Sequence, residues 1–288
     1  MSNYVLFTDS ACDIKPAMLD SWGVKYIPLT FRFNDDDREY SDNEMDITEF
    51  YDKMRKGSVA KTAAVNSESF KNAFENTLKE GTDILYLGFS SGLSTTYNSA
   101  KTAAAELALL YPERKIVTVD SLAASAGFGL FVYLVYKKKN EGASIEEAAE
   151  YAESIRLNVA HWFTVDDLVY LKRGGRISST AAFVGNALGI KPVLHVDNDG
   201  KLINMFKVRG RKTSLGALVD KYSETALDPK SGTVFISNGD CMADAKEVAR
   251  QIKEKHGVDV EIITDVGSVI GSHSGPGTLA LFFVAKER

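Results

Sequence analysis

Residues 83–110 contain the sequence feature that most constrains the fold, a strand that runs directly into a Gly- and Ser-rich turn and then into a helix. Residues 83–87, Asp-Ile-Leu-Tyr-Leu, form a short β-branched and aromatic run, which predicts a buried strand. The turn at residues 88–97 is Gly-Phe-Ser-Ser-Gly-Leu-Ser-Thr-Thr-Tyr, and residues 100–110 are rich in Ala and Leu, which predicts a helix. A unit of this kind is typical of an open α/β sheet.

The turn between this strand and this helix is a candidate anion site. Its backbone N–H groups, the helix dipole and the hydroxyls of Ser90, Ser91 and Ser94 are suited to a carboxylate or a phosphate. The alternative is that Ser94 or Thr95 only caps the helix.

The chain begins with the same kind of unit. Residues 4–7 predict a first buried strand, residues 8–13 a polar turn, and Pro16 the first turn of a helix. Such turns line ligand crevices at the carboxyl ends of parallel strands. Asp9 and Asp13 could bind Mg²⁺, but two carboxylates beside a helix start are more often caps, so we predict no metal site.

Three further segments carry local signals of structure, two in the first half of the chain and one near its end. Residues 24–33 predict a second strand. Residues 60–67 predict a polar turn before a helix, with Ser67 as its N-cap and Thr62 free for other contacts. Residues 270–277 predict a tight polar loop in which His273 either faces a ligand or bonds the loop backbone.

The pattern changes near residue 160. Residues 191–196 and 201–208 predict two strands, and the Asp-Asn-Asp-Gly between them predicts a hairpin. We therefore expect an α/β protein of two domains, with a mostly parallel sheet in residues 1–160, a mixed sheet in residues 161–288, and a ligand between them.

Residues 166–178 place three basic side chains around a double glycine. Lys172, Arg173 and Arg176 flank Gly174 and Gly175, a pattern suited to an anionic group. The alternative is a solvated turn with a capping glycine.

Composition excludes several classes of function. A net charge of −5 argues against nucleic acid as the main partner. No apolar run approaches the roughly 20 residues that a membrane helix needs, and the first residues show no signal-type segment. Cys12 and Cys241 are too few for a disulfide framework, which favours a cytoplasmic location. We find no Walker A motif or kinase Gly-rich loop, so phosphoryl transfer would need a partner that binds ATP.

Five stretches, in this order, resemble the DegV family. They are Thr-Asp-Ser-Ala-Cys-Asp at 8–13, Ser-Ser-Gly-Leu-Ser-Thr-Thr-Tyr at 90–97, residues 167–178, Gly-Ile-Lys-Pro at 189–192, and Ile-Gly-Ser-His-Ser-Gly-Pro-Gly at 270–277. The resemblance implies a protein that binds one long-chain fatty acid between two domains. It also implies that the protein is the acyl-binding subunit of a bacterial fatty acid kinase, not itself an enzyme, and that a separate ATP-binding subunit phosphorylates the carboxylate.

The resemblance also implies site residues. The fatty acid carboxylate is expected on Thr62 and Ser94, with Arg176, His273 and Ser91 beside it and no cofactor. Where the family usually has Thr-Ser-x-Pro-Ser, this chain has Thr-Ala-Ala-Val-Asn from Thr62 onward.

The basic residues Lys172 and Arg173 are the expected docking point for the kinase subunit, or they neutralise the new phosphate. Contact with a membrane is expected to be transient, without stable insertion.

Two other functions fit parts of the pattern. A serine esterase would use Ser90 in a Gly-x-Ser-x-Gly turn, with His273 as base and Asp240 or Asp265 as the third member. A lipid carrier or sensor would bind the acid without any kinase partner.

Overall fold

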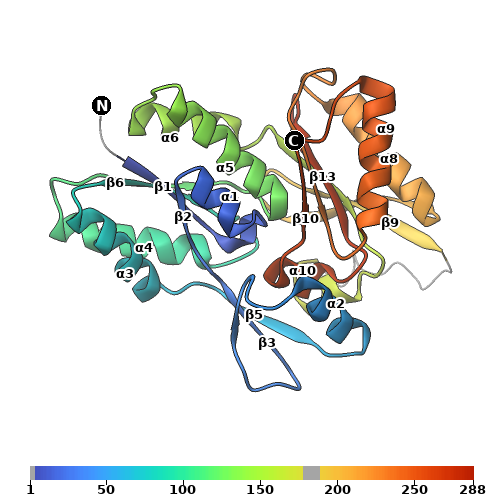
Figure 1. Cartoon of the computed structure of the whole chain (residues 1–288), viewed down its shortest axis with the longest axis horizontal. Coiled ribbons are helices and arrows are strands. Elements are labelled where there is room, and N and C mark those ends of the chain that lie inside the picture. Colours follow the sequence, from blue (N-terminus) through green and yellow to red (C-terminus); the bar gives the residue numbers. More distant parts are fainter. Residues whose placement is uncertain (1–3, 178–188) are drawn as a thin grey trace.

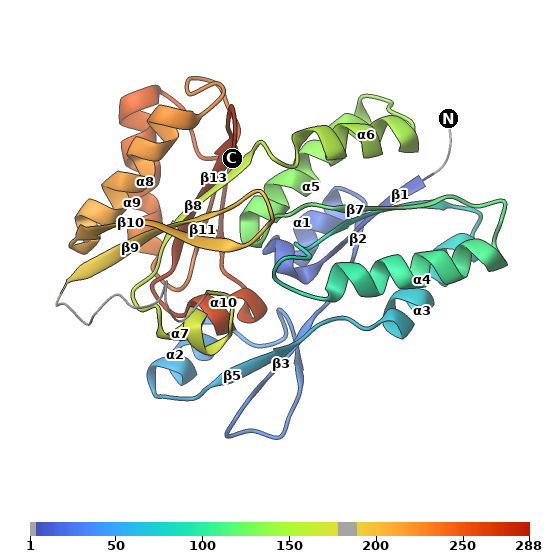
Figure 2. The ribbon, with the colours of Figure 1, turned by 180° about the vertical axis from the view of Figure 1, so that it is seen from behind.

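The computed structural model describes residues 4–177 and 189–288 and contains three β-sheets with helices packed on them (Figures 1 and 2). The first sheet is parallel, with strand order β2-β1-β6-β7. Its strands are β1 (Tyr4–Asp9), β2 (Val24–Ile27), β6 (Asp83–Gly88) and β7 (Ile116–Asp120). The expected parallel sheet in the first half is confirmed.

Helices cover both faces of the parallel sheet, with α1, α5 and α6 on one face and α3 and α4 on the other (Figures 1 and 2). The helices of this half are η1 (Ser10–Cys12), α1 (Pro16–Ser21), α3 (Ser67–Lys79), α4 (Thr96–Leu110), α5 (Ser125–Asn140) and α6 (Ile145–Ile155). Pro16 lies at the first turn of α1, as expected. Asn66, not Ser67, caps α3, because the Asn66 side chain accepts a hydrogen bond from the Ser69 N–H at 2.8 Å.

The second sheet is small, antiparallel and not predicted from the sequence. It has the order β4-β3-β5, and the helix that follows β4 packs on it. Its elements are β3 (Thr30–Phe33), β4 (Tyr40–Ser41), β5 (Ala60–Ala63) and α2 (Ile47–Arg55). The single strand expected at residues 24–33 is therefore wrong: Pro28, which has no N–H to donate, separates β2 from β3, and each joins a different sheet. Residues 60–63 are likewise a strand and not a turn.

The third sheet is mixed, as expected for the second half, and has the order β10-β9-β8-β13-β11-β12. Of its strand pairs in the described part of the chain, β11–β12 is parallel and the others are antiparallel. Its strands are β8 (Val159–Thr164), β9 (Ile190–Val196), β10 (Leu202–Arg209), β11 (Val234–Asn238), β12 (Ile262–Asp265) and β13 (Leu279–Val284). The expected hairpin is confirmed, since β9 and β10 pair antiparallel across residues 197–201.

The helices of the second half lie at the ends and on the outer face of the mixed sheet (Figure 1). They are α7 (Val169–Arg173), α8 (Arg211–Thr225), α9 (Met242–His256) and α10 (Ser268–Ser274). The loop expected at residues 270–277 is therefore partly wrong, because α10 continues to Ser274 and the turn begins only at Gly275.

One continuous core joins the parallel sheet to the mixed sheet. It includes Leu85 and Tyr86 of β6, Phe128 and Phe131 of α5, and Phe282 of β13, all fully or almost fully buried. Helix α5 lies between the two sheets in both views (Figures 1 and 2). Side chains from both halves therefore meet at a shared boundary, where the cavity described below lies.

Candidate functional site

A cavity of about 510 Å³ lies where the three sheets meet. This volume is within the range of sites that bind small ligands. The small sheet contributes Thr62, the turn after β6 contributes Leu93, and the mixed sheet contributes Phe163 and Phe282. Most of the cavity wall is apolar, but polar side chains also line it, and six of them form what we call the polar end. These are Thr62, Ser91, Ser94, Thr95, Arg176 and His273.

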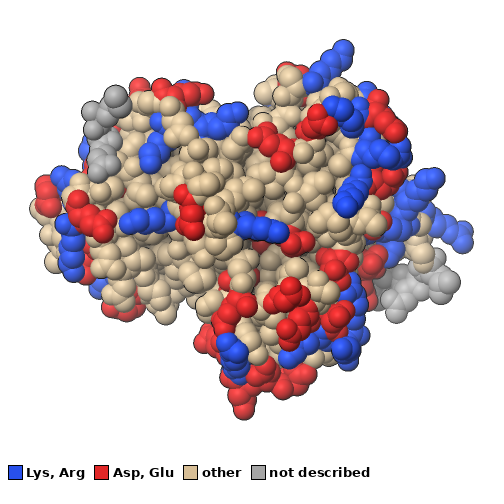
Figure 3. All heavy atoms as spheres, in the orientation of Figure 1, with Lys and Arg blue, Asp and Glu red and all other residues tan. Residues whose placement is uncertain are grey.

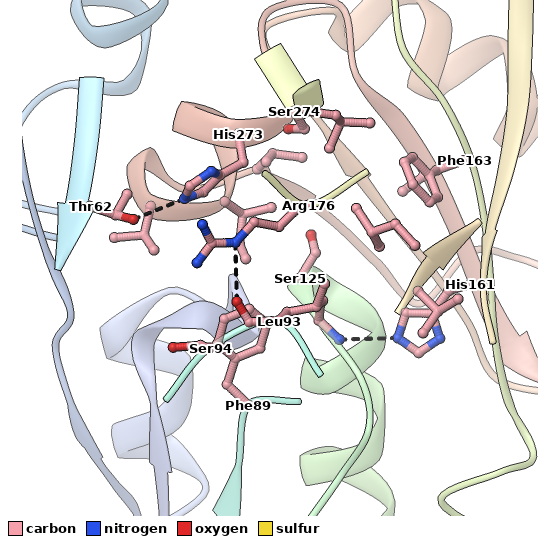
Figure 4. Close-up of a pocket in the computed structure, with 18 of the residues that line it drawn as sticks. Thr62, Phe89, Leu93, Ser94, Ser125, His161, Phe163, Arg176, His273 and Ser274 are labelled. Carbon is pink, nitrogen blue, oxygen red and sulfur yellow. Dashed lines mark hydrogen bonds between the residues drawn. The ribbon is translucent and has the colours of Figure 1, made fainter. Parts of the chain in front are cut away.

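The five side chains expected from the sequence as carboxylate ligands all line this cavity. They are Thr62, Ser91, Ser94, Arg176 and His273. Figure 4 shows Thr62 and His273 on one side of Arg176, with Ser94 below it. Their contact with a ligand stays a prediction; the structure establishes only that they share this place.

The first pair at the polar end comes from two distant segments. The Thr62 hydroxyl and His273 Nε2 are 2.9 Å apart, although 211 residues separate them (Figure 4). Thr62 is held by the pairing of β5 with β3, in which it lies opposite Phe31. His273 lies near the end of α10.

Two buried carboxylates hold the start of α10. Asp13 Oδ1 accepts a hydrogen bond from the Gly267 N–H at 3.0 Å, and Asp42 Oδ1 accepts one from the Val269 N–H at 3.2 Å. Because the first N–H groups of a helix have no partner within it, these bonds anchor α10 to the first half of the chain. They thereby position His273.

His273 is neutral at pH 7. Burial, and secondarily the positive charge of Arg176, lower its pKa from 6.5 to about 4. Its ring lies against Gly174, where a Cβ atom would approach His273 Nδ1 to 2.1 Å. Residue 174 therefore has to be glycine for the ring to occupy this place.

Arg176 supplies the positive charge of the polar end. Its Nε donates to the Leu93 carbonyl at 3.1 Å, and its Nη1 donates to the Gly174 carbonyl at 2.6 Å. The guanidinium is half-buried, and this burial lowers its pKa. Within residues 4–177 and 189–288, Arg176 forms no ion pair with an acidic side chain. An anion in the cavity would therefore meet a guanidinium that no acid of the described chain neutralises.

Ser94 lines the cavity and also supports the start of α4. Its Oγ lies 2.9 Å from Thr96 Oγ1 and accepts a hydrogen bond from the Thr96 N–H at 3.2 Å. Thr95 forms no side-chain cap bond. The Ser91 N–H donates to Asp120 Oδ1 at 3.2 Å, which fixes the turn, and the Ser91 side chain is exposed at the cavity.

Four more polar residues line the cavity and were missed in the sequence. They are Ser125, His161, Ser274 and Thr278. Ser274 could have been noticed, because it follows His273 in the same Gly- and Ser-rich stretch. His161 lies within an otherwise apolar strand, so the sequence carries no sign of its exposure to a cavity.

The remaining wall is apolar and comes from the mixed sheet, α7, α10 and the connections next to the other two sheets. Its residues are Leu29, Ala64, Phe89, Leu93, Ala124, Phe163, Leu171, Val196, Leu202, Val266, Val269, Ile270, Ala280 and Phe282. Such a surface suits a hydrocarbon chain.

Asp9 and Asp13 both accept hydrogen bonds from other groups of the protein. Asp9 accepts hydrogen bonds from the Tyr86 hydroxyl at 2.7 Å and from the N–H groups of Phe89 and Ala11. It therefore caps η1, as the capping alternative predicted. In the described part of the chain, no group of three or more His, Cys, Asp or Glu side chains could hold a metal ion.

The geometry opposes the esterase alternative. The Ser90 hydroxyl is fully buried and donates to the Gly200 carbonyl at 2.8 Å, outside the cavity. His273, the expected base, contacts Thr62. Asp240 pairs with Arg55, and Asp265 lies near Asn238. These groups therefore do not form a triad.

The two expected docking residues lie outside the cavity. Lys172 and Arg173 are exposed on the last turn of α7, and the Arg173 guanidinium lies 5.7 Å from the centre of the Tyr170 ring. Ser178, the last residue of the basic stretch noted in the sequence, lies outside the described residues.

The fold is that of an α/β protein, and the cavity suits a mostly apolar ligand with an anionic end. The chain belongs to the DegV family, because the family model described as an uncharacterised protein of the DegV family matches residues 3–286. This confirms the resemblance seen in the sequence.

Relatives with known folds and names agree with this assignment. A DegV domain-containing protein of Clostridium perfringens is 45% identical, with 100% of this chain and 99% of the relative covered. A fatty acid-binding protein of Thermotoga maritima is 33% identical over 98% of both chains. A fatty-acid-binding DegV family protein from Thermus thermophilus has a solved structure with 30% identity and a TM-score of 0.88, covering 98% of this chain and 99% of that one. Members of the family therefore bind fatty acids.

Among the helices of the described chain, none combines the length and the apolar character needed to cross a membrane.

Proposed function

We propose that this protein binds one long-chain fatty acid, with the carboxylate beside Arg176 and the acyl chain in the apolar part of the cavity. The observation that carries the proposal is a guanidinium, without an acidic partner among the described residues, at one end of a mostly apolar cavity. A single positive charge matches a single carboxylate, since His273 is neutral at pH 7. The fatty-acid-binding relatives support the same ligand class.

The energetics favour this ligand. Burying one CH₂ group contributes roughly 0.8 kcal/mol, so a 16-carbon chain could contribute on the order of 10 kcal/mol before the cost of ordering it. The carboxylate can be buried only if donors replace its water. Thr62 and Ser94 offer hydroxyls, His273 offers a ring nitrogen, and Arg176 offers charge-assisted N–H groups.

We also propose that the protein presents the carboxylate to a separate ATP-binding kinase subunit, which forms the acyl phosphate. Ser91 and Thr95, at the polar end of the cavity, are exposed, so this end faces the surface. Lys172 and Arg173 lie exposed in the segment that leads to Arg176 and are the proposed contact for that subunit. In this role the protein is the substrate-binding subunit and not itself an enzyme, and it acts in the cytoplasm with transient membrane contact.

The two units that enclose the ligand are proposed to be residues 1–160 and 161–288. Strand β8, the first strand of the mixed sheet along the chain, begins at Val159, two residues before the proposed second unit. Thr62 and Ser94 come from the first unit, and Arg176 and His273 from the second.

Native mass spectrometry of the purified protein, followed by extraction and identification of the released acid, tests the binding proposal. We expect one fatty acid per chain. In the double variant Thr62→Ala/Ser94→Ala the affinity should fall at least about tenfold, because each substitution removes a hydrogen bond to a charged group. Thr102→Ala, an exposed position on α4, is the matched control and should keep the ligand. A ligand-free protein that refuses added fatty acids would disprove the proposal.

Reversing the charge at Arg173 tests the kinase proposal. We expect Arg173→Glu to abolish acid-dependent ATP turnover by the cognate ATP-binding subunit while lipid binding is retained. Lys246→Glu, on the exposed face of α9, should leave both intact. If no ATP-binding subunit responds to the loaded wild-type protein, the carrier or sensor function replaces this proposal. If Arg173→Glu couples normally, the docking assignment is wrong.

A further inference from the structure

Ser90, in the turn that follows β6, is fully buried and holds two cavity residues in place. Its N–H donates to the Ala123 carbonyl at 3.0 Å. Its carbonyl accepts hydrogen bonds from the N–H groups of Leu93 and Ser94, each at 3.1 Å. Leu93 and Ser94 both line the cavity, so the conformation of this part of its wall depends on the backbone of Ser90.

The Ser90 hydroxyl joins this turn to the other half of the chain. It accepts a hydrogen bond from the Gly92 N–H at 3.2 Å and donates to the Gly200 carbonyl at 2.8 Å, in the turn between β9 and β10. The fit is close, because a Cβ atom at residue 200 would lie 2.2 Å from Ser90 Oγ. A Cβ atom at residue 92 would likewise lie 2.5 Å from the Asp199 carbonyl oxygen. The two turns are therefore held directly against each other.

The direction of the Arg176 guanidinium depends on the turn after β6. Arg176 Nε donates to the Leu93 carbonyl at 3.1 Å (Figure 4), and its Nη1 donates to the Gly174 carbonyl at 2.6 Å. Gly174 belongs to the same segment as Arg176, whereas Leu93 lies 83 residues earlier in the chain. The Leu93 carbonyl thus sets the guanidinium relative to the first half of the chain. Because bonds to a carboxylate depend on direction, a shift of this carbonyl would turn the guanidinium away from its ligand.

From these contacts, and resting on the proposed function, we propose that Ser90 is a positioning residue of the carboxylate site and acts through the Leu93 carbonyl and Arg176. Ser90 does not line the cavity, so it does not touch the ligand. Its hydroxyl fixes the turn after β6 against the β9–β10 turn, and thereby fixes the place of the Leu93 carbonyl.

The experiment compares hexadecanoic acid with hexadecanamide, which has the same chain and an uncharged head of similar shape. Displacement of a fluorescent fatty acid from the delipidated protein gives both affinities. Wild type should bind the acid at least about tenfold more tightly than the amide, because only the acid forms a charge-assisted bond with Arg176. Ser90→Ala should weaken binding of the acid about tenfold and change binding of the amide by less than about twofold.

A double-mutant cycle with Arg176→Gln tests the route of this effect. If Ser90 acts through Arg176, Ser90→Ala should weaken binding of the acid by less than about twofold in the Arg176→Gln background. Independent effects of the two substitutions would overturn the route through Arg176.

Ser214→Ala is the matched control. Ser214 is also fully buried and its hydroxyl donates to a backbone carbonyl, that of Arg211 at 2.8 Å, but it lies in α8 and outside the cavity. This variant should keep the wild-type ratio of the two affinities. Ser90→Cys, which fills the space with a weak donor, should lower the ratio in the same direction as Ser90→Ala and provides the test if that variant does not fold.

The other outcomes overturn the inference in distinguishable ways. Unchanged binding of the acid by Ser90→Ala would mean that Arg176 is held without the Ser90 hydroxyl. Equal weakening of acid and amide would mean that Ser90 only stabilises the fold. Both results leave the proposed function intact, whereas a wild-type protein that does not bind hexadecanoic acid would refute the proposed function as well.

Discussion

Buried carboxylates form the framework behind the polar end of the cavity. Burial raises the pKa of Asp9 and of Asp42 to about 6, and burial and the charge of Asp42 raise the pKa of Asp13 well above its usual range. Asp42 Oδ1 accepts from the Val269 N–H, whereas its Oδ2 has no partner among the described residues. The ionised form of Asp42 therefore opposes folding near neutral pH, although the residue anchors α10.

The substitution Asp42→Asn measures how much the ionised Asp42 side chain destabilises the folded state. A pKa raised on folding, here from 3.8 to about 6, gives a contribution to stability that is fully present below the unfolded value and is lost as the pH rises through the folded value. Asn lacks this titration. We expect the free energy of unfolding of the variant, relative to wild type, to grow by about 1.4 kcal/mol between pH 5 and pH 7.5, since one pKa unit corresponds to 1.36 kcal/mol.

Urea unfolding at the two pH values measures this difference. Thr102→Ala, at an exposed position of α4 that carries no titratable group, should show no comparable dependence on pH in this range. A constant difference between wild type and Asp42→Asn would mean that Asp42 does not titrate with a raised pKa.

Helices α7 and α10 bring together the basic stretch and the stretch that contains His273. They pack against each other near the small sheet (Figure 2). The contact depends on Gly174 at the end of α7, which lies directly against the His273 ring. The basic stretch and the histidine stretch are about 100 residues apart in the chain. They are in contact because Gly174 leaves room for the His273 ring.

Gly174→Ala should displace His273 and break its contact with Thr62. The added Cβ would lie 2.1 Å from His273 Nδ1, a separation that side chains do not tolerate. We expect fatty acid affinity to fall by about 10- to 100-fold, as expected when a hydrogen bond of about 1.5–3 kcal/mol to a charged group is lost. Displacement titration measures the fatty acid affinity, and the NMR chemical shifts of the His273 ring report its displacement.

Gly216→Ala is the control for this substitution. It lies within α8, has no atom within 4 Å of an added Cβ, and should be neutral or stabilising. Unchanged affinity in Gly174→Ala would show that His273 is not needed for binding.

At the scale of the whole molecule, charge is unevenly distributed. Figure 3 shows acidic side chains gathered over the lower lobe formed by the small sheet and α2. These residues are Asp35, Asp36, Asp37, Glu39, Glu44, Asp46, Glu49 and Asp52. An acidic lobe beside the basic end of α7 gives a partner surface a preferred orientation, because like charges repel and opposite charges attract.

The halves of the molecule are also joined by Arg288. Its guanidinium donates to the Val159 carbonyl at 3.2 Å and to the Leu122 carbonyl at 2.6 Å, and it also reaches the carbonyls of Arg156 and Asp197. These four groups belong to the connection after β7, to the end of α6, to the start of the mixed sheet and to the β9–β10 turn. One side chain thus holds both halves.

Arg288→Ala should lower the free energy of unfolding by about 2–3 kcal/mol, because hydrogen bonds to charged groups contribute about 1.5–3 kcal/mol and several carbonyls lose their donor. Urea unfolding monitored by fluorescence measures the loss. Lys286→Ala, at an exposed neighbour, should change stability by less than about 0.5 kcal/mol. Equal effects of the two substitutions would contradict this role of Arg288.

The sequence by itself determined the local units. The strand–turn–helix order, Pro16 at the start of α1 and the hairpin at residues 197–200 depend on neighbouring residues, so pattern and turn chemistry were sufficient to predict them. The family resemblance, which rests on ordered motifs, predicted five of the six residues at the polar end of the cavity.

Only the tertiary structure decided how these units combine. The small sheet pairs β3 with β5 across 26 intervening residues, from Ala60 back to Phe33, and such long-range pairing leaves no local pattern. The same holds for the Thr62–His273 contact, which joins segments 211 residues apart. Local preferences therefore specify the elements of this protein, and the burial of their faces against one another specifies its site.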